Sequence, residues 1–456
     1  MSRFYYDLFL KINPFFKHAL YFISVSFLGF GLLKVLRPRT EPKPRNLDLF
    51  FTSVSAVTVS SMSTVEMEVF SNEQLIVLTI LMFAGGEVFT SMVELHFWRF
   101  ELGKSSKLDH VKMEKNPDHI VIVSDLSHNN GDYNSSNKNL SLEYESIRFL
   151  GFVVLGYLLV IQAFGISCVL VHLSLVSSAR NVLRKKGINP STFAIFTVVS
   201  VFASCGFIPT NENMIVFRKN SGLLLILVPQ ILLGNTLFAP CLRFSIWVLG
   251  KIKVCEFNSE YLLKNTGVIG YYHFLPSMHS RALAGTVLGL LLVGFGLFSG
   301  MEWNSDGLHG LNTYQKVVGG VFESANVRHS GATIVDLSTV APAVLVFFIV
   351  MMYLPPYTSF LPMKSNEEQI PAQQEKWRKR AAIQDFVLSP LSYLAIFIIA
   401  ICITERERIQ QDPLNFSVLN ITIEVIRVDS AHVLMSEGAS GLSCCYASGT
   451  VCEPSG

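Results

Sequence analysis

Charged residues are scarce in this chain. Asp, Glu, Lys and Arg make up only 15% of its 456 residues, against roughly 25% in ordinary globular proteins. The formal net charge is +2, and the basic residues are dispersed. This composition excludes a disordered chain, which needs a high net charge, and a nucleic-acid-binding protein, which needs a concentrated basic surface.

Signatures of enzymes and metal sites are also missing. The eight cysteines include no CxxC pair, so neither a zinc site nor a disulfide framework is predicted. HExxH and GxSxG motifs are absent, and Leu102-Gly103-Lys104-Ser105 lacks the upstream glycine of a phosphate-binding loop because Trp98 stands there. We therefore predict no enzyme, no resident cofactor and no structural metal.

Apolar residues are abundant instead. They form 50% of the chain, and its mean hydropathy is +0.43. A membrane-spanning helix needs about 20 mostly apolar residues. Seven runs reach that length and predict an all-α, polytopic membrane protein: 16–36, 73–98, 148–173, 221–250, 281–300, 337–360 and 386–403.

Shorter apolar stretches, rich in Ser and Thr, lie between these runs. Stretches of about 10–14 apolar residues are too short to span a bilayer and are typical of re-entrant helices. Irregular backbone at membrane depth is tolerated where it is buried in protein or lines a water-filled cavity. The order of span, short helix and span therefore predicts pore loops, at 47–60, 190–203, 311–325 and 413–426.

These pore loops form an internal repeat. The segment 51–55, FTSVS, is matched 145 residues later by FTVVS at 196–200, and the same offset places Ser61 opposite Gly206. Small residues at this point permit the close backbone approach that an ion filter needs. We predict four helix–pore loop–helix repeats around a central pore, the last one incomplete, with filter positions at Ser61, Gly206 and Gly331, flanked by Ser60, Cys205 and Ser330.

The repeats set the expected domain boundaries. Two polar segments between repeats are assigned to the cytosol from their composition and basic residues, although the basic residues within 34–45 do not fit that sidedness. The expected order is repeat A at 1–98, a cytosolic loop at 99–147, repeat B at 148–250, a connecting loop at 251–280, repeat C at 281–360, a cytosolic loop at 361–385, partial repeat D at 386–426 and an aberrant tail at 427–456.

The filter residues point to a cation as the transported species. A filter replaces the hydration shell of an ion with backbone carbonyls. The Cβ and hydroxyl of Ser61 restrict the backbone at this position, which disfavours a K⁺ site with four equivalent sides. The smaller Na⁺ can still be coordinated there. Transient Na⁺ is thus the expected ligand, with K⁺ as the alternative.

Charged residues follow or precede the filter positions. Acidic side chains at a pore mouth raise the local cation concentration, and ordinary solvated carboxylates are the alternative reading. Arg328 either limits cation occupancy near Gly331 or pairs with a neighbouring carboxylate. The acidic candidates are Glu66, Glu68, Glu212 and Asp336.

Segments 50–68, 204–213 and 328–338 closely resemble the pore loops of plant high-affinity potassium transporters, the HKT branch of the Trk/Ktr/HKT superfamily, and the likeness runs from about residue 20 to Ile426. The resemblance implies four helix–pore loop–helix repeats around one pore in the plasma membrane. Ser at the first filter position implies the sodium-selective subclass, linked to salt tolerance, with passive, voltage-driven permeation. Mixed Na⁺/K⁺ transport is an alternative. Superfamily relatives are often dimers, which makes a homodimer the implied assembly.

The sequence departs from that family after Ile426. A fourth filter containing Asn-Val-Gly-Phe and a last basic span are expected, but residues 427–434 read RVDSAHVL, with Val433 in place of the glycine. An incomplete fourth repeat would expose polar backbone to lipid, so poor conduction is expected. A gene-model or splicing change would explain the departure. The alternative function is a truncated, non-conducting isoform that pairs with intact transporters.

Overall fold

The computed structural model describes residues 14–40, 43–97, 130–253, 256–269, 271–336, 339–354 and 357, with a few isolated positions beyond residue 390. Every regular element in these ranges is a helix, which confirms the all-α prediction. The predicted segments 361–385 and 427–456, with Val433, lie outside the described residues, as does nearly all of 386–426.

Three segments of the chain share one order of elements. Each has a long first helix, a short helix that ends at a loop, and a second helix after that loop. They are α2 (Pro14–Val35), α3 (Asn46–Val57) and α4 (Asn72–Gly85) in repeat A; α6 (Asn130–Leu175), α8 (Pro190–Phe202) and α9 (Ser221–Leu233) in repeat B; and α13 (Ser277–Glu302), α14 (Thr313–His329) and α15 (Pro342–Tyr353) in repeat C.

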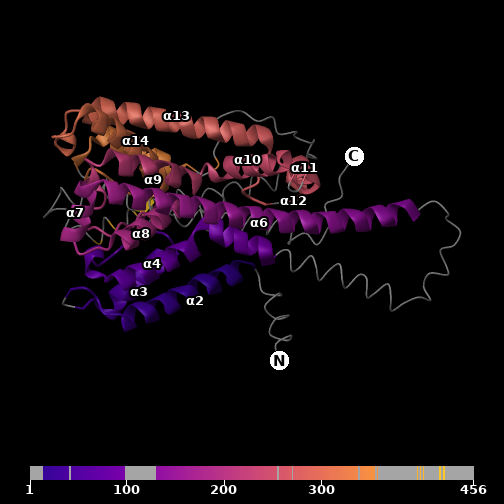
Figure 1. The fold of residues 1–456 in the computed structure, drawn as a ribbon, viewed down its shortest axis with the longest axis horizontal. Helices are drawn as coiled ribbons and strands as arrows, with labels where there is room; N and C mark the ends of the chain where they lie inside the picture. The colour runs from indigo at the N-terminus through magenta and orange to yellow at the C-terminus, as the bar shows by residue number, and fades with distance from the viewer. Residues whose placement is uncertain are drawn as a thin grey trace.

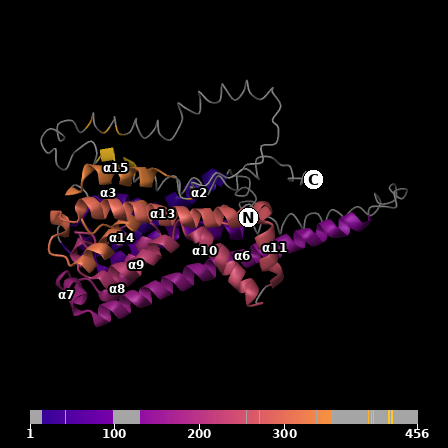
Figure 2. The ribbon, with the colours of Figure 1, turned by 90° about the horizontal axis from the view of Figure 1, so that it is seen from above.

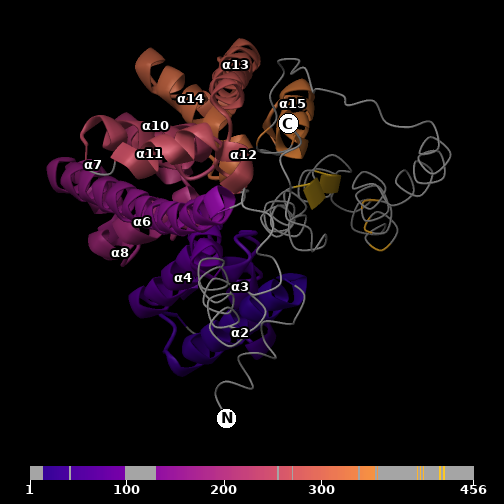
Figure 3. The same ribbon diagram turned by 90° about the vertical axis from the view of Figure 1, so that its right-hand side faces the viewer.

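The short helix of each repeat packs against both of its flanking helices. Contacts join α3 to α2 and α4, α8 to α6 and α9, and α14 to α13 and α15. Viewed nearly along the helices, repeats A (indigo), B (magenta) and C (orange) occupy successive sectors (Figure 3). The short helices match the predicted pore-loop stretches closely in position.

The number of uninterrupted spans differs from the prediction. The described ranges contain three helices that are long and apolar enough to cross a bilayer, near 16–35, 144–175 and 277–302. The predicted spans at 73–98 and 221–250 are instead bent pairs: α4 with the helix Glu87–Phe97, at 54°, and α9 with α10 (Phe238–Lys251), at 82°. At about 1.5 Å per residue, the 12-residue α15 is also too short to cross about 30 Å of hydrocarbon alone.

Two segments expected to be loops contain helix. Helix α6 begins at Asn130, so the predicted loop 99–147 is shorter than expected at its C-terminal end, and α6 extends beyond the other helices (Figures 1 and 2). Helix growth is cooperative, and a long apolar helix propagates into polar residues that would not start one. The connecting segment 251–280 contains α11 (Glu256–Lys264) and α12 (Thr266–Ile269). The buried Leu262 anchors α11.

Buried phenylalanines dominate the interior, while other apolar side chains face outward. One core cluster joins repeats B and C through residues such as Phe217 and Phe322, and a second joins repeat A to the short helix of repeat B. On the first helices, Phe27, Phe164 and Leu292 remain 58%, 67% and 62% exposed. Outward-facing apolar side chains of this size suit contact with lipid tails.

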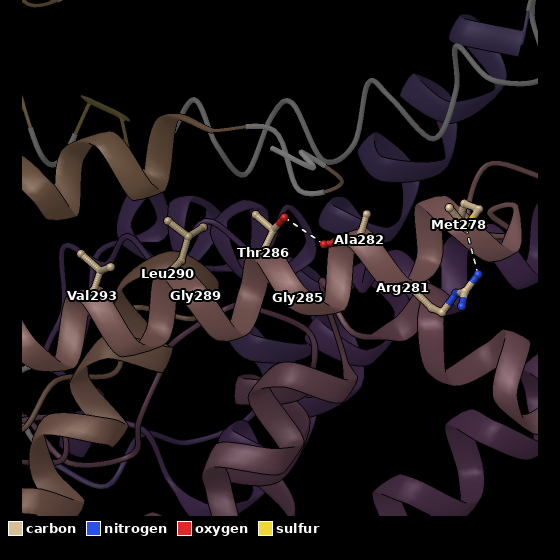
Figure 4. Close-up of a pocket in the computed structure, with 8 residues that line it drawn as sticks. All are labelled: Met278, Arg281, Ala282, Gly285, Thr286, Gly289, Leu290 and Val293. Carbon is tan, nitrogen blue, oxygen red and sulfur yellow. Dashed lines mark hydrogen bonds between the residues drawn. The ribbon is translucent and has the colours of Figure 1, made fainter. Parts of the chain in front are cut away.

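Small residues leave a groove along one face of α13. Gly285 and Gly289 have no described atom within 4 Å of the position where a Cβ would lie. The groove has a volume of about 620 Å³ and an almost wholly apolar lining drawn from α13 alone (Figure 4). Because all of its lining residues are on α13, the groove does not include the filter loops.

Candidate selectivity filter and pore mouth

The three predicted filter positions share an unusual backbone conformation. Ser61, Gly206 and Gly331 have φ angles of +54°, +84° and +70°. This left-handed region is open to glycine, but a Cβ makes it costly by roughly 1–2 kcal/mol. Ser61 therefore adopts a conformation that its two counterparts reach without strain.

The first two filter loops are near copies of each other. Val59 and Ser204, 145 residues apart like Ser61 and Gly206, are also left-handed, with φ of +48° and +60°. The flanking residues repeat the pattern, because the amide of Ser60 donates to Ser55 O at 3.0 Å and that of Cys205 donates to Ser200 O at 2.9 Å. The sequence repeat thus corresponds to a repeat of backbone geometry.

The third loop follows a related path with a longer pore helix. Helix α14 continues to His329, and the Gly331 amide donates to Asn326 O at 2.8 Å. The hydroxyl of the flanking Ser330 donates to the Asn326 side chain. Behind the loop, the buried Glu323 accepts from the amide of Ile334 at 3.1 Å. Pore-helix side chains therefore hold this loop on both sides of Gly331.

Hydroxyl groups support the first loop. The Ser55 hydroxyl accepts from the Met62 amide at 2.7 Å and lies 3.0 Å from the hydroxyl of Ser60. Thr58 Oγ1 lies 3.2 Å from the same Ser60 oxygen. Because these bonds flank Ser61 on both sides, they help to hold its left-handed backbone.

Glycines of the second helices lie against the ends of the pore helices. A Cβ on Gly85 would lie 1.8 Å from Val57 O, and one on Gly234 would lie 2.0 Å from Phe202 O. Val57 and Phe202 are again 145 residues apart, and both second helices bend directly after their glycine. Sequence reasoning missed these bends, although Gly85-Gly86 and Gly234-Asn235 within apolar runs were available as signals.

Asn235 connects the bend of repeat B to the second filter loop. Its amide nitrogen donates to Ser204 Oγ at 2.9 Å, and the side chain is buried. The next residue, Thr236, has its hydroxyl 2.8 Å from His329 Nε2 at the end of α14. Two adjacent polar residues thus join repeat B to its own filter loop and to the pore helix of repeat C.

The acidic residues of the expected pore mouth come together around a lysine. Lys186 Nζ lies 2.5 Å from carboxylate oxygens of both Glu68 and Glu212, which belong to different repeats. Asn211 donates from its side chain to Glu66 at 2.7 Å and from its backbone to Glu68 at 3.0 Å. Sequence reasoning missed Lys186, which lies beyond the C-terminal end of α7 (Ser177–Lys185), far along the chain from Glu68.

The cluster changes the protonation of its members. Desolvation by itself would lower the pKa of Lys186, but hydrogen bonds and charge attraction from Glu212 and Glu68 outweigh it and raise that pKa. The hydrogen bond from Lys186 in turn lowers the pKa of Glu212. Lys186 therefore stays protonated and offsets part of the negative charge at the mouth. The net negative charge there is smaller than a count of the acidic residues alone would give.

The two remaining charged candidates lie apart from this cluster. Arg328 is on the last turn of α14, and its Nη1 donates to Met351 O at 2.7 Å. Its guanidinium therefore donates a hydrogen bond to a backbone carbonyl near the C-terminal end of α15, as cationic side chains often do at helix ends. Asp336 is exposed, and its backbone carbonyl accepts from the Thr339 hydroxyl at 2.7 Å.

Comparison with known proteins decides the family. The TrkH family, described as a cation transport protein, matches residues 134–428. The cation transporter HKT1;3 of Oryza sativa subsp. japonica is 46% identical over 433 residues, which is 91% of this chain and 79% of that protein. This chain belongs to the Trk/Ktr/HKT family of membrane cation transporters. The predictions of a polytopic membrane protein and of a non-enzymatic protein are thereby confirmed.

Two further likenesses agree with the family. The sodium transporter HKT1 of Arabidopsis thaliana is 48% identical over 401 residues, covering 86% of this chain and 78% of that transporter. The crystal structure of the potassium transporter TrkH from Vibrio parahaemolyticus has a TM-score of 0.50 and 14% identity, with 93% of this chain and 83% of the other covered. At that identity the structural likeness supports the fold alone.

Proposed function

We propose that this transporter moves Na⁺ passively across the plasma membrane through a filter that includes Ser61, Gly206 and Gly331. The observation behind the proposal is the left-handed Ser61 at a position where the other two loops have glycine. A serine here places a Cβ and a hydroxyl beside the carbonyls that would replace the hydration shell. That side chain reduces the freedom of the loop to form a K⁺ site, and it offers a short oxygen ligand to Na⁺.

The arrangement around the filter suits cation entry. Glu66, Glu68 and Glu212 bring negative charge to one side of the loops, and Lys186 lowers it. A moderately negative mouth concentrates cations without trapping them. A homodimer is the assembly that we propose from the superfamily.

A second candidate function rests on the sequence after Ile426. Val433 in place of the expected fourth filter glycine favours a non-conducting chain that pairs with intact transporters and lowers their activity. Co-expression with a full-length sodium transporter of the same family separates the two functions. A Na⁺ transporter should add to the current of its partner, whereas a pairing isoform should reduce it.

Flux into liposomes tests the main proposal directly. Purified full-length chain is reconstituted with a Na⁺ gradient or a K⁺ gradient of equal size, and uptake is followed as a function of an imposed membrane potential. Voltage-driven Na⁺ uptake that exceeds K⁺ uptake supports the proposal. Equal uptake of both ions would favour mixed transport. If neither ion is taken up, the pairing isoform is the function that remains.

A further inference from the structure

Three hydroxyl groups of the first filter loop and its short helix lie in hydrogen-bond contact with one another. Ser55 Oγ lies 3.0 Å from Ser60 Oγ, which lies 3.2 Å from Thr58 Oγ1. At one end of this row, the Met62 amide donates to Ser55 Oγ at 2.7 Å. At the other end, Thr58 Oγ1 donates to Val54 O at 2.9 Å. The row therefore connects an amide of the filter loop to a carbonyl of α3.

The two ends of the row fix the direction of every hydrogen bond within it. A hydroxyl has one proton to donate and two lone pairs with which to accept. Since the proton of Thr58 goes to Val54 O, Ser60 must donate to Thr58. Ser60 has then used its proton, so Ser55 must donate to Ser60. Each of the three hydroxyls thus donates once and accepts once, and we call Ser55, Ser60 and Thr58 the hydroxyl chain.

The hydroxyl chain brackets two residues with a left-handed backbone. Val59, with φ of +48°, lies between Thr58 and Ser60. Ser61, with φ of +54°, lies between Ser60 and Met62. Neither is a glycine, and a Cβ makes this conformation costly, most of all when the side chain is β-branched. Such conformations persist where the surrounding structure over-determines them, and hydrogen bonds on both sides of each residue provide that restraint.

The second repeat does not have the residues to form this chain. The positions equivalent to the hydroxyl chain, 145 residues later, are Ser200, Ala203 and Cys205. Ala203 has no hydroxyl, and the thiol of a cysteine is only a weak donor. Ser200 Oγ is buried and has no hydrogen-bond partner. The filter residue of this loop is Gly206, which reaches its positive φ without a Cβ.

The third repeat lacks the hydroxyl chain as well. Aligned on the filter position, its equivalent residues are Ala325, Arg328 and Ser330. The hydroxyl of Ser330 donates to the side chain of Asn326 instead, and the filter residue is Gly331. Among the three described filter loops, the hydroxyl chain therefore occurs in the one whose filter residue carries a Cβ.

We propose that Ser55 and Thr58 are positioning residues of the filter, whose hydroxyls, joined through Ser60, hold Ser61 in the conformation that its counterparts adopt as glycines. The chain fixes the direction of the carbonyls on either side of Ser61, and those carbonyls decide which ion the loop fits. Loss of a hydroxyl frees the loop, as Ser61→Gly does by another route. The effect on ion selectivity rests on the proposed function, whereas the chain itself does not.

Hydrogen exchange of the Met62 amide tests the chain without any ion flux, because a protected amide exchanges only when its bond opens. Thr58 is joined to this amide through Ser60 and Ser55, and bonds in a chain strengthen one another. In the purified full-length chain, Thr58→Val should speed the exchange several-fold, and Thr58→Ser, which keeps the hydroxyl, should restore the wild-type rate. Ser200→Ala removes a hydroxyl without a partner and is the matched control. An equal rate in Thr58→Val and wild type would overturn the chain; unchanged exchange in α13 shows that each variant is folded.

The ratio of K⁺ to Na⁺ permeability in proteoliposomes tests the link to selectivity. Ser55→Ala should raise this ratio several-fold, and adding it to Ser61→Gly should change nothing further, because a glycine does not need the restraint. A wild-type ratio in Ser55→Ala, despite faster exchange of the Met62 amide, would overturn the positioning role. If Ser61→Gly itself leaves the ratio unchanged while Thr58→Val still speeds the exchange, the proposed function fails and the chain is supported.

Discussion

Gly234 lies directly against the carbonyl oxygen of Phe202, so close that a Cβ would come within 2.0 Å of that oxygen. Gly85 makes the equivalent contact with Val57 in repeat A. Each contact presses the second helix of a repeat onto the end of its pore helix, just before the filter loop begins. The absence of a side chain at these two positions therefore sets the distance between the filter loops and the helices behind them.

Gly234→Ala should destabilise the protein. The added methyl meets backbone, which cannot rotate away, and overpacking of this kind costs typically about 1–3 kcal/mol. Gly289→Ala on α13 is the matched control, because nothing described lies within 4 Å of its Cβ position and alanine favours a helix. Chemical or thermal unfolding in detergent measures both. Equal stability of the two variants would contradict the close contact, in which a Cβ on Gly234 would lie 2.0 Å from Phe202 O.

Lys186→Gln should make the pore mouth more negative. The change leaves Glu68 and Glu212 without their shared cation and raises the pKa of Glu212 towards its ordinary value, because the hydrogen bond from Lys186 is the main cause of its lowering. Cation attraction to the mouth should increase, so half-saturation of uptake from that side should fall to a lower Na⁺ concentration, most clearly at low salt. Lys185→Gln, one residue earlier on α7, controls for loss of a positive charge; an equal effect there would contradict a specific role for Lys186.

The same cluster predicts how stability depends on pH. The lowered pKa of Glu212 contributes stability above the pKa that this residue has in the unfolded chain, and the contribution is lost as the pH falls through the folded value. The raised pKa of Lys186 contributes stability below its unfolded pKa, which is lost as the pH rises through the folded value. Because the Glu212 side chain is 52% exposed, the effect should be at most about 1 kcal/mol. Unfolding of wild type and Lys186→Gln should therefore differ near pH 7 and converge at acid pH; a constant difference would contradict this linkage.

Asn235→Ala should weaken the second filter loop. The substitution removes the amide that donates to Ser204 Oγ, and loss of one buried hydrogen bond costs about 1 kcal/mol or somewhat more. A double-mutant cycle with Ser204→Ala isolates this bond, because two residues in direct contact show a coupling energy that distant ones lack. Additive effects of the two substitutions on the free energy of unfolding would mean that the bond contributes nothing.

The sequence was enough to predict where the three short helices lie, and the three residues predicted as filter positions share a left-handed backbone. Apolar length and the 145-residue repeat predicted 47–60 and 190–203, and the helices occupy Asn46–Val57 and Pro190–Phe202. Apolar length depends on residues that are neighbours in the chain, and the repeat is found by comparing two segments of the sequence, so neither signal requires knowledge of the contacts between helices. The left-handed backbone of Ser61 and Gly206 then follows from the turn that ends each short helix.

The contacts between repeats could not be predicted in this way. Lys186 and Glu68 are 118 residues apart, and nothing in the residues around either one indicates the other. The bends after Gly85 and Gly234 depend on carbonyls of a different helix, and a hydropathy average over 221–250 hides them. The roles of Ser61, Gly206 and Gly331 in selectivity remain predictions.

The most direct measurement is the ratio of K⁺ to Na⁺ permeability in Ser61→Gly, taken from the voltage at which the ion flux reverses in proteoliposomes. Ser63→Gly makes the same replacement two residues later, at an exposed position of the loop. If Ser61 sets the preference for Na⁺, Ser61→Gly should raise the K⁺/Na⁺ ratio several-fold and Ser63→Gly should leave it unchanged. A ratio in Ser61→Gly equal to that of the wild-type chain would contradict a filter in which this serine excludes K⁺.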